Sequence, residues 1–98
     1  DDYLLDLDGL FDALKVPLPE KFKMPEMNKF DGTGNPKSHI RLYISVLQLL
    51  ELKAEHFTLL FPRTLIGDAQ DWYLTLQVSV VRDWKRLARD FVAQYIFN

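Results

Sequence analysis

Residues 30–51 have the sequence FDGTGNPKSHIRLYISVLQLLE, which predicts a glycine-rich turn followed by a long helix. Asn35 is a good N-cap and Pro36 suits the first helical position, so the helix should begin there and run to about Glu51. Apolar residues recur along it at helical spacing: Ile40, Leu42, Tyr43, Ile44, Val46, Leu47, Leu49 and Leu50. The remaining polar line consists of Lys37, Arg41, Ser45 and Gln48. A helix this apolar should be central and mostly buried.

Three further helices are predicted toward the C-terminus. One should span residues 53–61 and end or kink at Pro62. The next should start at Gly67 or Asp68, and a turn over residues 77–81 should lead to a last helix that Asp83 caps. The last helix should run to about Tyr95. The faces expected to point inward are Ala54, Phe57, Leu60 and Phe61; then Ala69, Trp72, Tyr73 and Leu76; then Trp84, Leu87, Ala88, Phe91 and Tyr95.

The N-terminal third of the chain has a different character. Residues 3–15 have the apolar spacing of a short helix, whereas three prolines and the Gly32/Gly34 pair exclude a long helix over residues 16–35. This second stretch still contains large apolar side chains, namely Phe22, Met24, Met27 and Phe30. We therefore expect an extended segment that lies on the helices that follow it.

Together these elements predict an all-α fold, a compact bundle of about five helices with an extended N-terminal segment that contains proline and glycine. A chain of 98 residues is long enough for one domain that folds without a metal or a disulfide. We divide it into a flanking helix, residues 1–17, and a helical domain, residues 18–98.

The composition narrows the classes of function. Hydrophobic residues make up 48% of the chain and charged residues 27%, as in a soluble globular domain. The lack of cysteine excludes disulfides, zinc knuckles and thiol nucleophiles. The net charge of −2 argues against nucleic-acid binding as the main task, and no apolar run has the length of a membrane span. The chain shows no signal peptide and does not begin with Met, so we expect an excised fragment, and the absence of cysteine fits an intracellular protein.

Motifs that would indicate catalysis are weak. The stretch 31–34, Asp-Gly-Thr-Gly, does not match the Asp-Thr-Gly of aspartic proteases, and it lacks the strand and the Lys-Ser/Thr of a phosphate-binding loop. A tight turn is the favoured interpretation. His39 and His56 have no partners at metal-ligand spacing, so we interpret them as surface or helix-start histidines. Trp72 and Trp84 are expected in the core. We expect no enzymatic activity, no cofactor and no catalytic or metal-binding residue.

The last predicted helix has a basic side formed by Arg82, Lys85, Arg86 and Arg89. One interpretation is a contact for RNA or for an acidic neighbouring subunit. The favoured interpretation is a solvated face, balanced by acidic neighbours such as Asp90.

Three blocks of sequence resemble the retrotransposon Gag domain of the gypsy class. The first comprises LPEKFKMP at 18–25, FDGTGNP at 30–36 and the His39-Ile40 pair, and it is similar to the family's F-x-G-x-x-D/N-P pattern. The second is FPRTLIGDAQDWY at 61–73, which resembles L-x-G-x-A-x-x-W. The third is the closing helix with its aromatic spacing. The residues that carry the resemblance are Phe30, Gly32, Pro36, Gly67, Ala69, Trp72, Trp84, Leu87 and Phe91.

The resemblance implies a capsid N-terminal-domain-like fold and a structural role. Gag domains of this kind self-associate into cytoplasmic virus-like particles, so the implied partners are other Gag copies. RNA would be bound only by segments outside this chain. The signature positions suit packing and turns rather than catalysis; for example, the small pair Gly67 and Ala69 should permit close helix approach beside Trp72. Candidate subunit contacts are the polar positions Lys37, Arg41, Ser45 and Gln48.

A second hypothesis is a domesticated Gag domain that binds partner peptides or proteins in a groove. In that case Phe22, Met24, Met27 and Phe30 would cover the groove from within the same chain. The helix predicted over 3–15 would be a tethered ligand or would swap onto a neighbour.

Overall fold

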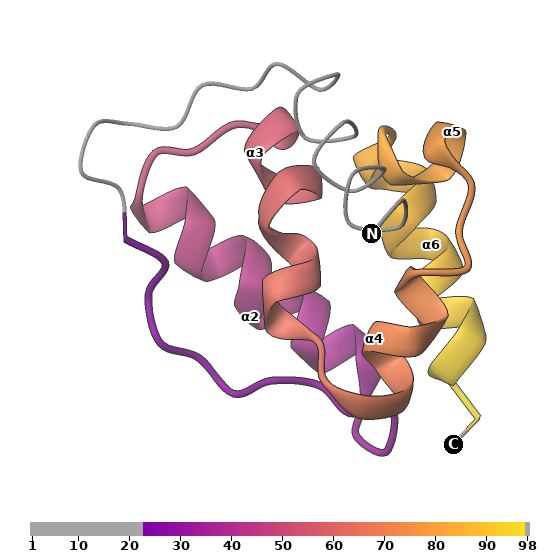
Figure 1. The fold of residues 1–98 in the computed structure, drawn as a ribbon. Helices are drawn as coiled ribbons and strands as arrows, with labels where there is room; N and C mark the ends of the chain where they lie inside the picture. The colour runs from indigo at the N-terminus through magenta and orange to yellow at the C-terminus, as the bar shows by residue number, and fades with distance from the viewer. Residues whose placement is uncertain (1–22, 98) are drawn as a thin grey trace.

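The computed structural model describes residues 23–97, and their regular structure is helical (Figure 1). Five α-helices and one 3-10 helix, η1, follow one another: α2 Pro36–Leu49, α3 Ala54–Leu60, η1 Phe61–Thr64, α4 Gly67–Tyr73, α5 Val78–Val81 and α6 Trp84–Tyr95. The prediction of an all-α fold with about five helices is confirmed. The helix predicted over 3–15 lies outside the described residues. No described helix combines the length and hydrophobicity that crossing a membrane requires.

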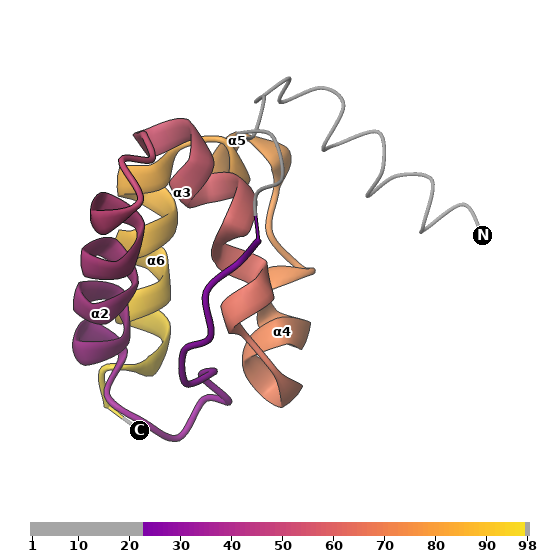
Figure 2. The ribbon, with the colours of Figure 1, turned by 90° about the vertical axis from the view of Figure 1, so that its left-hand side faces the viewer.

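Helix α6 is the central element of the bundle. It contacts α2, α3 and α5, and Figure 2 shows α2 and α6 side by side, running in opposite directions. The predicted cap is confirmed, because the Asp83 side chain accepts a hydrogen bond from the amide of Arg86. Three residues on one stripe of α6, Leu87, Phe91 and Tyr95, are buried. This stripe supplies the surface on which the other helices pack.

Helix α2 begins as predicted but is less buried than predicted. The Asn35 side chain accepts hydrogen bonds from the amides of Lys37 and Ser38, and Pro36 occupies the first turn. The buried residues are only Pro36, His39, Tyr43 and Leu47. The expectation of a mostly buried helix is wrong because α2 lies on the outside of the bundle (Figure 2), so only one stripe meets the core. Its exposed apolar residues are Leu42 and Leu49, and Leu50 directly after it is exposed as well.

Two of the connections between the longer helices are themselves helical, namely η1 and α5. At Pro62 the chain passes from α3 into η1, as the predicted break requires. Residues 77–81, predicted as a turn, instead contain the short helix α5, with helical hydrogen bonds from Val81 to Gln77 and from Arg82 to Val78. Valines disfavour helix locally. Here Val80 and Val81 are buried, and α5 packs on α6, so tertiary contact overrides the local preference.

The extended segment ahead of α2 is attached to the bundle at Phe30. The Phe30 amide donates to the carbonyl of Thr64 at 2.8 Å, and the Ile66 amide donates to the carbonyl of Phe30 at 3.0 Å. The Phe30 ring is buried, with its centroid 4.9 Å from that of Phe91 and 5.2 Å from that of Tyr95, both edge-on. Over the described part, the predicted extended segment lying on the helices is confirmed.

The two signature glycines have different physical roles. Gly32 has φ +107°, and a Cβ there would stand 3.3 Å from a ring carbon of Tyr95. Gly67 has φ +55°, and a Cβ there would meet no atom within 4 Å, so its role is the left-handed backbone conformation. The predicted close helix approach at Gly67 is therefore wrong, whereas Ala69 is fully buried. The predicted turn at 31–34 is present, since the Asp31 carboxylate accepts hydrogen bonds from Thr33.

The two tryptophans are half-buried and pack against the aromatic core. Trp72 lies against Phe91, with ring centroids 5.9 Å apart. Trp84 lies against Phe57 and Phe61, at 5.6 Å and 5.5 Å, both edge-on. Edge-on aromatic pairs add about 0.5–1.5 kcal/mol each beyond the area they bury. Both side chains therefore serve the core, as predicted.

His39 is a buried residue rather than a surface one, although it does stand in the first turn of α2. The surface interpretation is wrong because position 39 lies on the buried stripe of α2, where Phe30, Phe61 and Phe91 surround the ring. His39 Nε2 lies 3.0 Å from the Thr64 hydroxyl, which itself donates to the Phe61 carbonyl. The imidazole is therefore the donor, with its proton on Nε2.

Replacing Phe30 by Ala should lower the free energy of unfolding by about 3–5 kcal/mol, because a buried aromatic anchor is lost. Phe30→Leu should cost roughly 1–2 kcal/mol, which keeps the effect measurable if the Ala variant does not fold. Phe97→Ala is the matched control, since Phe97 is 96% exposed, and it should change stability by no more than about 0.5 kcal/mol. Urea unfolding measures all three variants. Equal losses at positions 30 and 97 would contradict the anchoring role.

The stability of the domain should depend on the protonation of His39. Burial lowers the pKa of His39 below its ordinary value of 6.5, so the unfolded chain takes up the proton first as the pH falls. The free energy of unfolding should therefore decline as the pH drops from about 6.5 through the lower folded-state pKa, and level off below it.

His39→Gln should remove this part of the pH dependence, because a glutamine amide can still donate to Thr64 but does not titrate. His56→Gln is the matched control and should retain the decline. Unfolding curves at about pH 7 and about pH 5 measure the difference. An unchanged decline in His39→Gln would show that other groups cause it.

Candidate functional site

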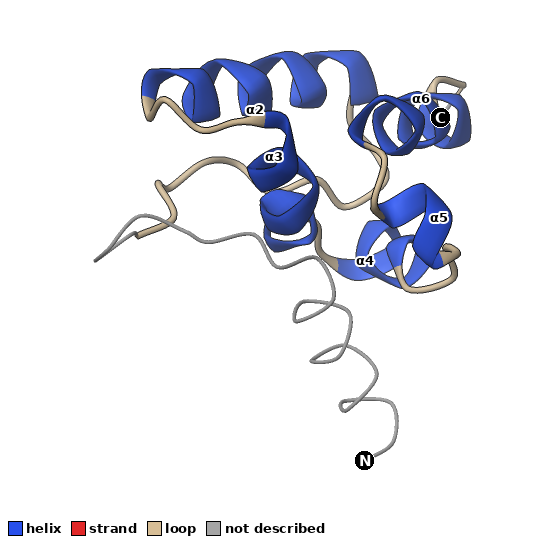
Figure 3. Ribbon diagram, turned by 90° about the horizontal axis from the view of Figure 1, so that it is seen from above, coloured by secondary structure: helices blue, strands red, loops and turns tan. Residues whose placement is uncertain are grey.

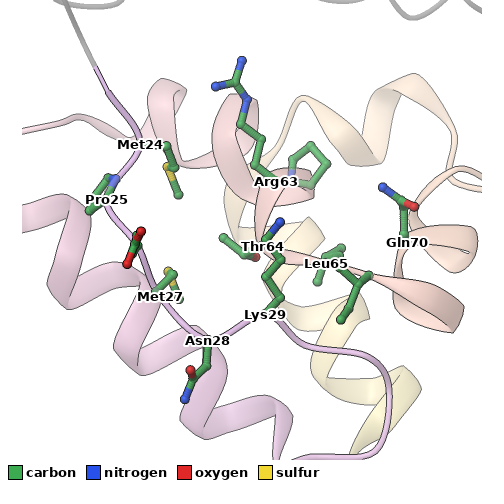
Figure 4. A pocket seen from close by; sticks show the side chains of 12 residues that line it. Met24, Pro25, Met27, Asn28, Lys29, Arg63, Thr64, Leu65 and Gln70 are labelled. Atoms are coloured by element: carbon green, nitrogen blue, oxygen red, sulfur yellow. The ribbon is translucent and has the colours of Figure 1, made fainter.

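A hollow lies between the extended segment and the chain around η1. We call it the segment groove; its volume is about 920 Å³. Figure 4 shows Met24 and Met27 on one wall, across from Arg63, Thr64 and Leu65. The groove is lined by residues 24–29, residues 62–66 and Gln70. Met24 and Met27, which were predicted to cover a groove, line this hollow instead. Of the residues predicted to cover it, Phe22 lies outside the described residues.

The extended segment leaves one side of the segment groove open. Phe30 pairs with Leu65 in an isolated parallel bridge, but residues 24–29 make no backbone hydrogen bond within the described part of the chain. Met24 and Met27 are half-buried and pack against the core. The structure therefore places Met24 and Met27 at the segment groove, whereas Phe30 does not line it and is buried in the core instead.

Few of the side chains that line the segment groove could take part in a chemical reaction. The Thr64 hydroxyl is already shared between His39 and the Phe61 carbonyl. The charged side chains at its rim, Glu26, Lys29 and Arg63, are at least partly exposed. Free backbone groups beside apolar side chains suit an extended peptide, which pairs its main chain and inserts alternate side chains.

The predicted contact line on α2 lies on one accessible face. Lys37, Arg41, Ser45 and Gln48 are all exposed. Leu42 and Leu49 stand beside this line and are 45% and 84% exposed. The sequence did not indicate these exposed leucines, because their apolar character suggested burial. We call the combined surface the α2 outer face.

A second hollow, which the sequence did not indicate, lies between α4, the end of α6 and the turn before α2. We call it the acidic hollow; its volume is about 650 Å³. Asp31, Asp68 and Asp71 line it together with the rings of Trp72 and Tyr95. The spacing of Asp68 and Asp71 on a helix was a visible signal. Asp31 joins them only because the Phe30 anchor brings the turn to α4.

The pKa values of two groups that line the acidic hollow are shifted from their ordinary values. Hydrogen bonds from the side chain and backbone of Thr33 hold the pKa of Asp31 below its ordinary value, so this carboxylate stays ionised. Burial raises the pKa of the Tyr95 hydroxyl, and the charges of Asp68 and Asp71 raise it further. The negative potential of the acidic hollow thus extends to the Tyr95 ring.

The buried titratable groups of the described residues serve packing. Tyr43 donates to the carbonyl of Phe57 at 2.6 Å, and burial raises its pKa. Burial also raises the pKa of Tyr73 to about 12. Within residues 23–97, no group of His, Asp and Glu side chains is placed to hold a metal ion.

The basic side of α6 is exposed as expected, at Arg82, Lys85, Arg86 and Arg89. These four side chains form no ion pair with another described residue.

No protein-family profile, curated protein or solved structure matches this chain. The resemblance to the Gag domain therefore stays a prediction.

Proposed function

We propose that this chain is a Gag-type capsid domain whose task is to associate with copies of itself. One observation carries the proposal: the three blocks of sequence that resemble the Gag domain meet in a single aromatic cluster. Phe30 from the first block and Trp72 from the second both contact Phe91 from the third, with ring centroids 4.9 Å and 5.9 Å apart. Residues that carry the resemblance thus meet in the interior of the domain, which suits a structural role.

The distribution of polar groups supports a structural role. Among the described residues, no buried side-chain nitrogen or oxygen lacks a hydrogen-bond partner. His39, Tyr43 and Thr64 are committed to bonds that hold the bundle together. A catalytic site usually keeps reactive groups poised in a cleft. Here the segment groove is lined by exposed charged groups, backbone and apolar side chains, and the acidic hollow by aspartates, threonines, a glutamine and the rings of Trp72 and Tyr95.

The surface offers several places for contact between copies. Large apolar side chains are exposed on different elements: Leu42 and Leu49 on α2, Leu74 after α4, Val78 on α5 and Phe97 after α6. These side chains lie on different elements, so they offer contact points on more than one face of the domain. A shell is built from such contacts when each copy uses more than one face.

We expect the purified chain to associate reversibly as its concentration rises. Light scattering should show a mass above that of the monomer, and negative-stain electron microscopy should show regular particles or tubes at the highest concentrations. The physical reason is that repeated weak contacts between identical domains act cooperatively once a ring or shell can close. A constant monomeric mass up to the solubility limit would contradict the proposal.

A monomer would instead favour the second candidate function, a domesticated domain that binds partner peptides. The observation that favours it is the open segment groove beside the unpaired backbone of residues 24–29. The decisive readout would be saturable peptide binding that shifts the amide signals of Met27 and Lys29 in nuclear magnetic resonance spectra, while those of Lys85 and Arg89 stay in place.

A further inference from the structure

Two helices of this domain carry opposite charges without internal compensation. Helix α2 contains Lys37 and Arg41 and no acidic residue. Helix α4 contains Asp68 and Asp71 and no basic residue. None of these four side chains forms an ion pair with another described residue. Both charged faces are therefore available to a partner.

The two helices that carry these charges lie on opposite sides of the bundle. Figure 2 and Figure 3, seen from perpendicular directions, both place α2 and α4 on opposite sides of the bundle. Within one copy, no ion pair joins Lys37 or Arg41 to an aspartate of the acidic hollow. Two copies can bring these surfaces together.

We infer that the acidic hollow of one copy binds the α2 outer face of the next, with Lys37 and Arg41 lying against Asp31, Asp68 and Asp71. This inference rests on the proposed function and specifies the surfaces that self-association uses. Because the two surfaces differ, the contact is head-to-tail, and it leaves one free surface of each kind at the ends of a dimer. Repetition of the contact therefore builds a ring or an open chain.

The spacing of the charges fits this pairing. Lys37 and Arg41 are one helical turn apart on the same face of α2, which separates them by about 6 Å along the axis. Asp68 and Asp71 are three residues apart on α4, a rise of about 4.5 Å. Apolar neighbours accompany both pairs: Leu42 is 45% exposed beside Arg41, and Leu74 is 40% exposed beyond Asp71. Each of the two helices thus carries two charges, with a partly exposed leucine close to them in sequence.

The hollow suits a side-chain cation better than a metal ion. Its three carboxylates do not form a group that could hold a metal among the described residues. The rings of Trp72 and Tyr95 line the same space, and aromatic faces attract guanidinium and ammonium groups. The basic side of α6 is the rival source of cations, but it lacks the exposed leucine that stands beside Arg41.

The test uses three matched double variants of the full chain. K37S/R41S removes the charges of the α2 outer face, and D68N/D71N removes those of α4. K85S/R89S removes two positive charges at the same spacing from α6 and serves as the control. Sedimentation velocity should show that the first two variants associate about three- to tenfold more weakly than the wild type, and that the control does not change.

Mixing the two weakened variants gives a sharper result. Each retains one intact surface, so an equimolar mixture should form a 1:1 heterodimer in preference to longer assemblies. Association of the wild type should also weaken when the ionic strength rises from about 0.05 M to about 0.5 M.

Four outcomes would overturn this inference while leaving self-association in place: wild-type behaviour of both α2 and α4 variants, an equal loss in the α6 control, a loss in only one of the two variants, or a mixture that forms no heterodimer. A wild-type chain that is monomeric at every concentration would overturn the proposed function itself. The two failures are therefore distinguishable.

Discussion

The pairing of Phe30 with the chain after η1 is the constraint on which the rest of this domain depends. Two backbone hydrogen bonds fix Phe30 between Thr64 and Ile66. The ring then enters the aromatic cluster around Phe91 and Tyr95 of α6. Three segments that are far apart in sequence are thereby held close together: the turn that starts α2, the residues that start α4, and the end of α6. The same anchor places Asp31 at the acidic hollow.

A second layer of polar contacts fastens the helices to each other. His39 of α2 donates to Thr64, which donates to the carbonyl of Phe61, while Tyr43 of α2 donates to the carbonyl of Phe57. Each buried hydrogen bond of this kind adds modestly to the free energy of unfolding. Removing one partner costs more, because the other is then left buried without a hydrogen bond. They account for the buried polar groups that would otherwise be candidates for catalysis. What remains for function is the surface, with its uncompensated charges and exposed leucines.

Much of the fold could be predicted because its determinants are local. The Asn35-Pro36 cap, the break at Pro62, the Asp83 cap and the stripe of Leu87, Phe91 and Tyr95 each depend on residues within a few positions of one another. The features of the helices that were predicted wrongly depend on tertiary packing. α5 forms because Val80 and Val81 are buried, and His39 is buried because its stripe of α2 faces α6.

The surfaces were harder to predict for the same reason. Nothing local distinguishes the exposed Leu42 and Leu49 from the buried Leu47, since all three stand on an apolar helix. The line of Lys37, Arg41, Ser45 and Gln48 was visible as a polar stripe, and its exposure follows from that pattern. The acidic hollow was not visible, because Asp31 reaches Asp68 and Asp71 only through the chain's return at Phe30.

Amide hydrogen exchange tests the Phe30 anchor most directly. The neighbouring amides of Asn28 and Lys29 make no hydrogen bond within the described residues and give the rate of an open backbone. If the anchor holds the fold together, the amides of Phe30 and Ile66 should exchange as slowly as that of Phe91 in α6, through opening of the whole domain. If the amides of Phe30 and Ile66 exchanged as fast as those of Asn28 and Lys29, the segment would not be held against the bundle. That result would contradict the anchoring role of Phe30.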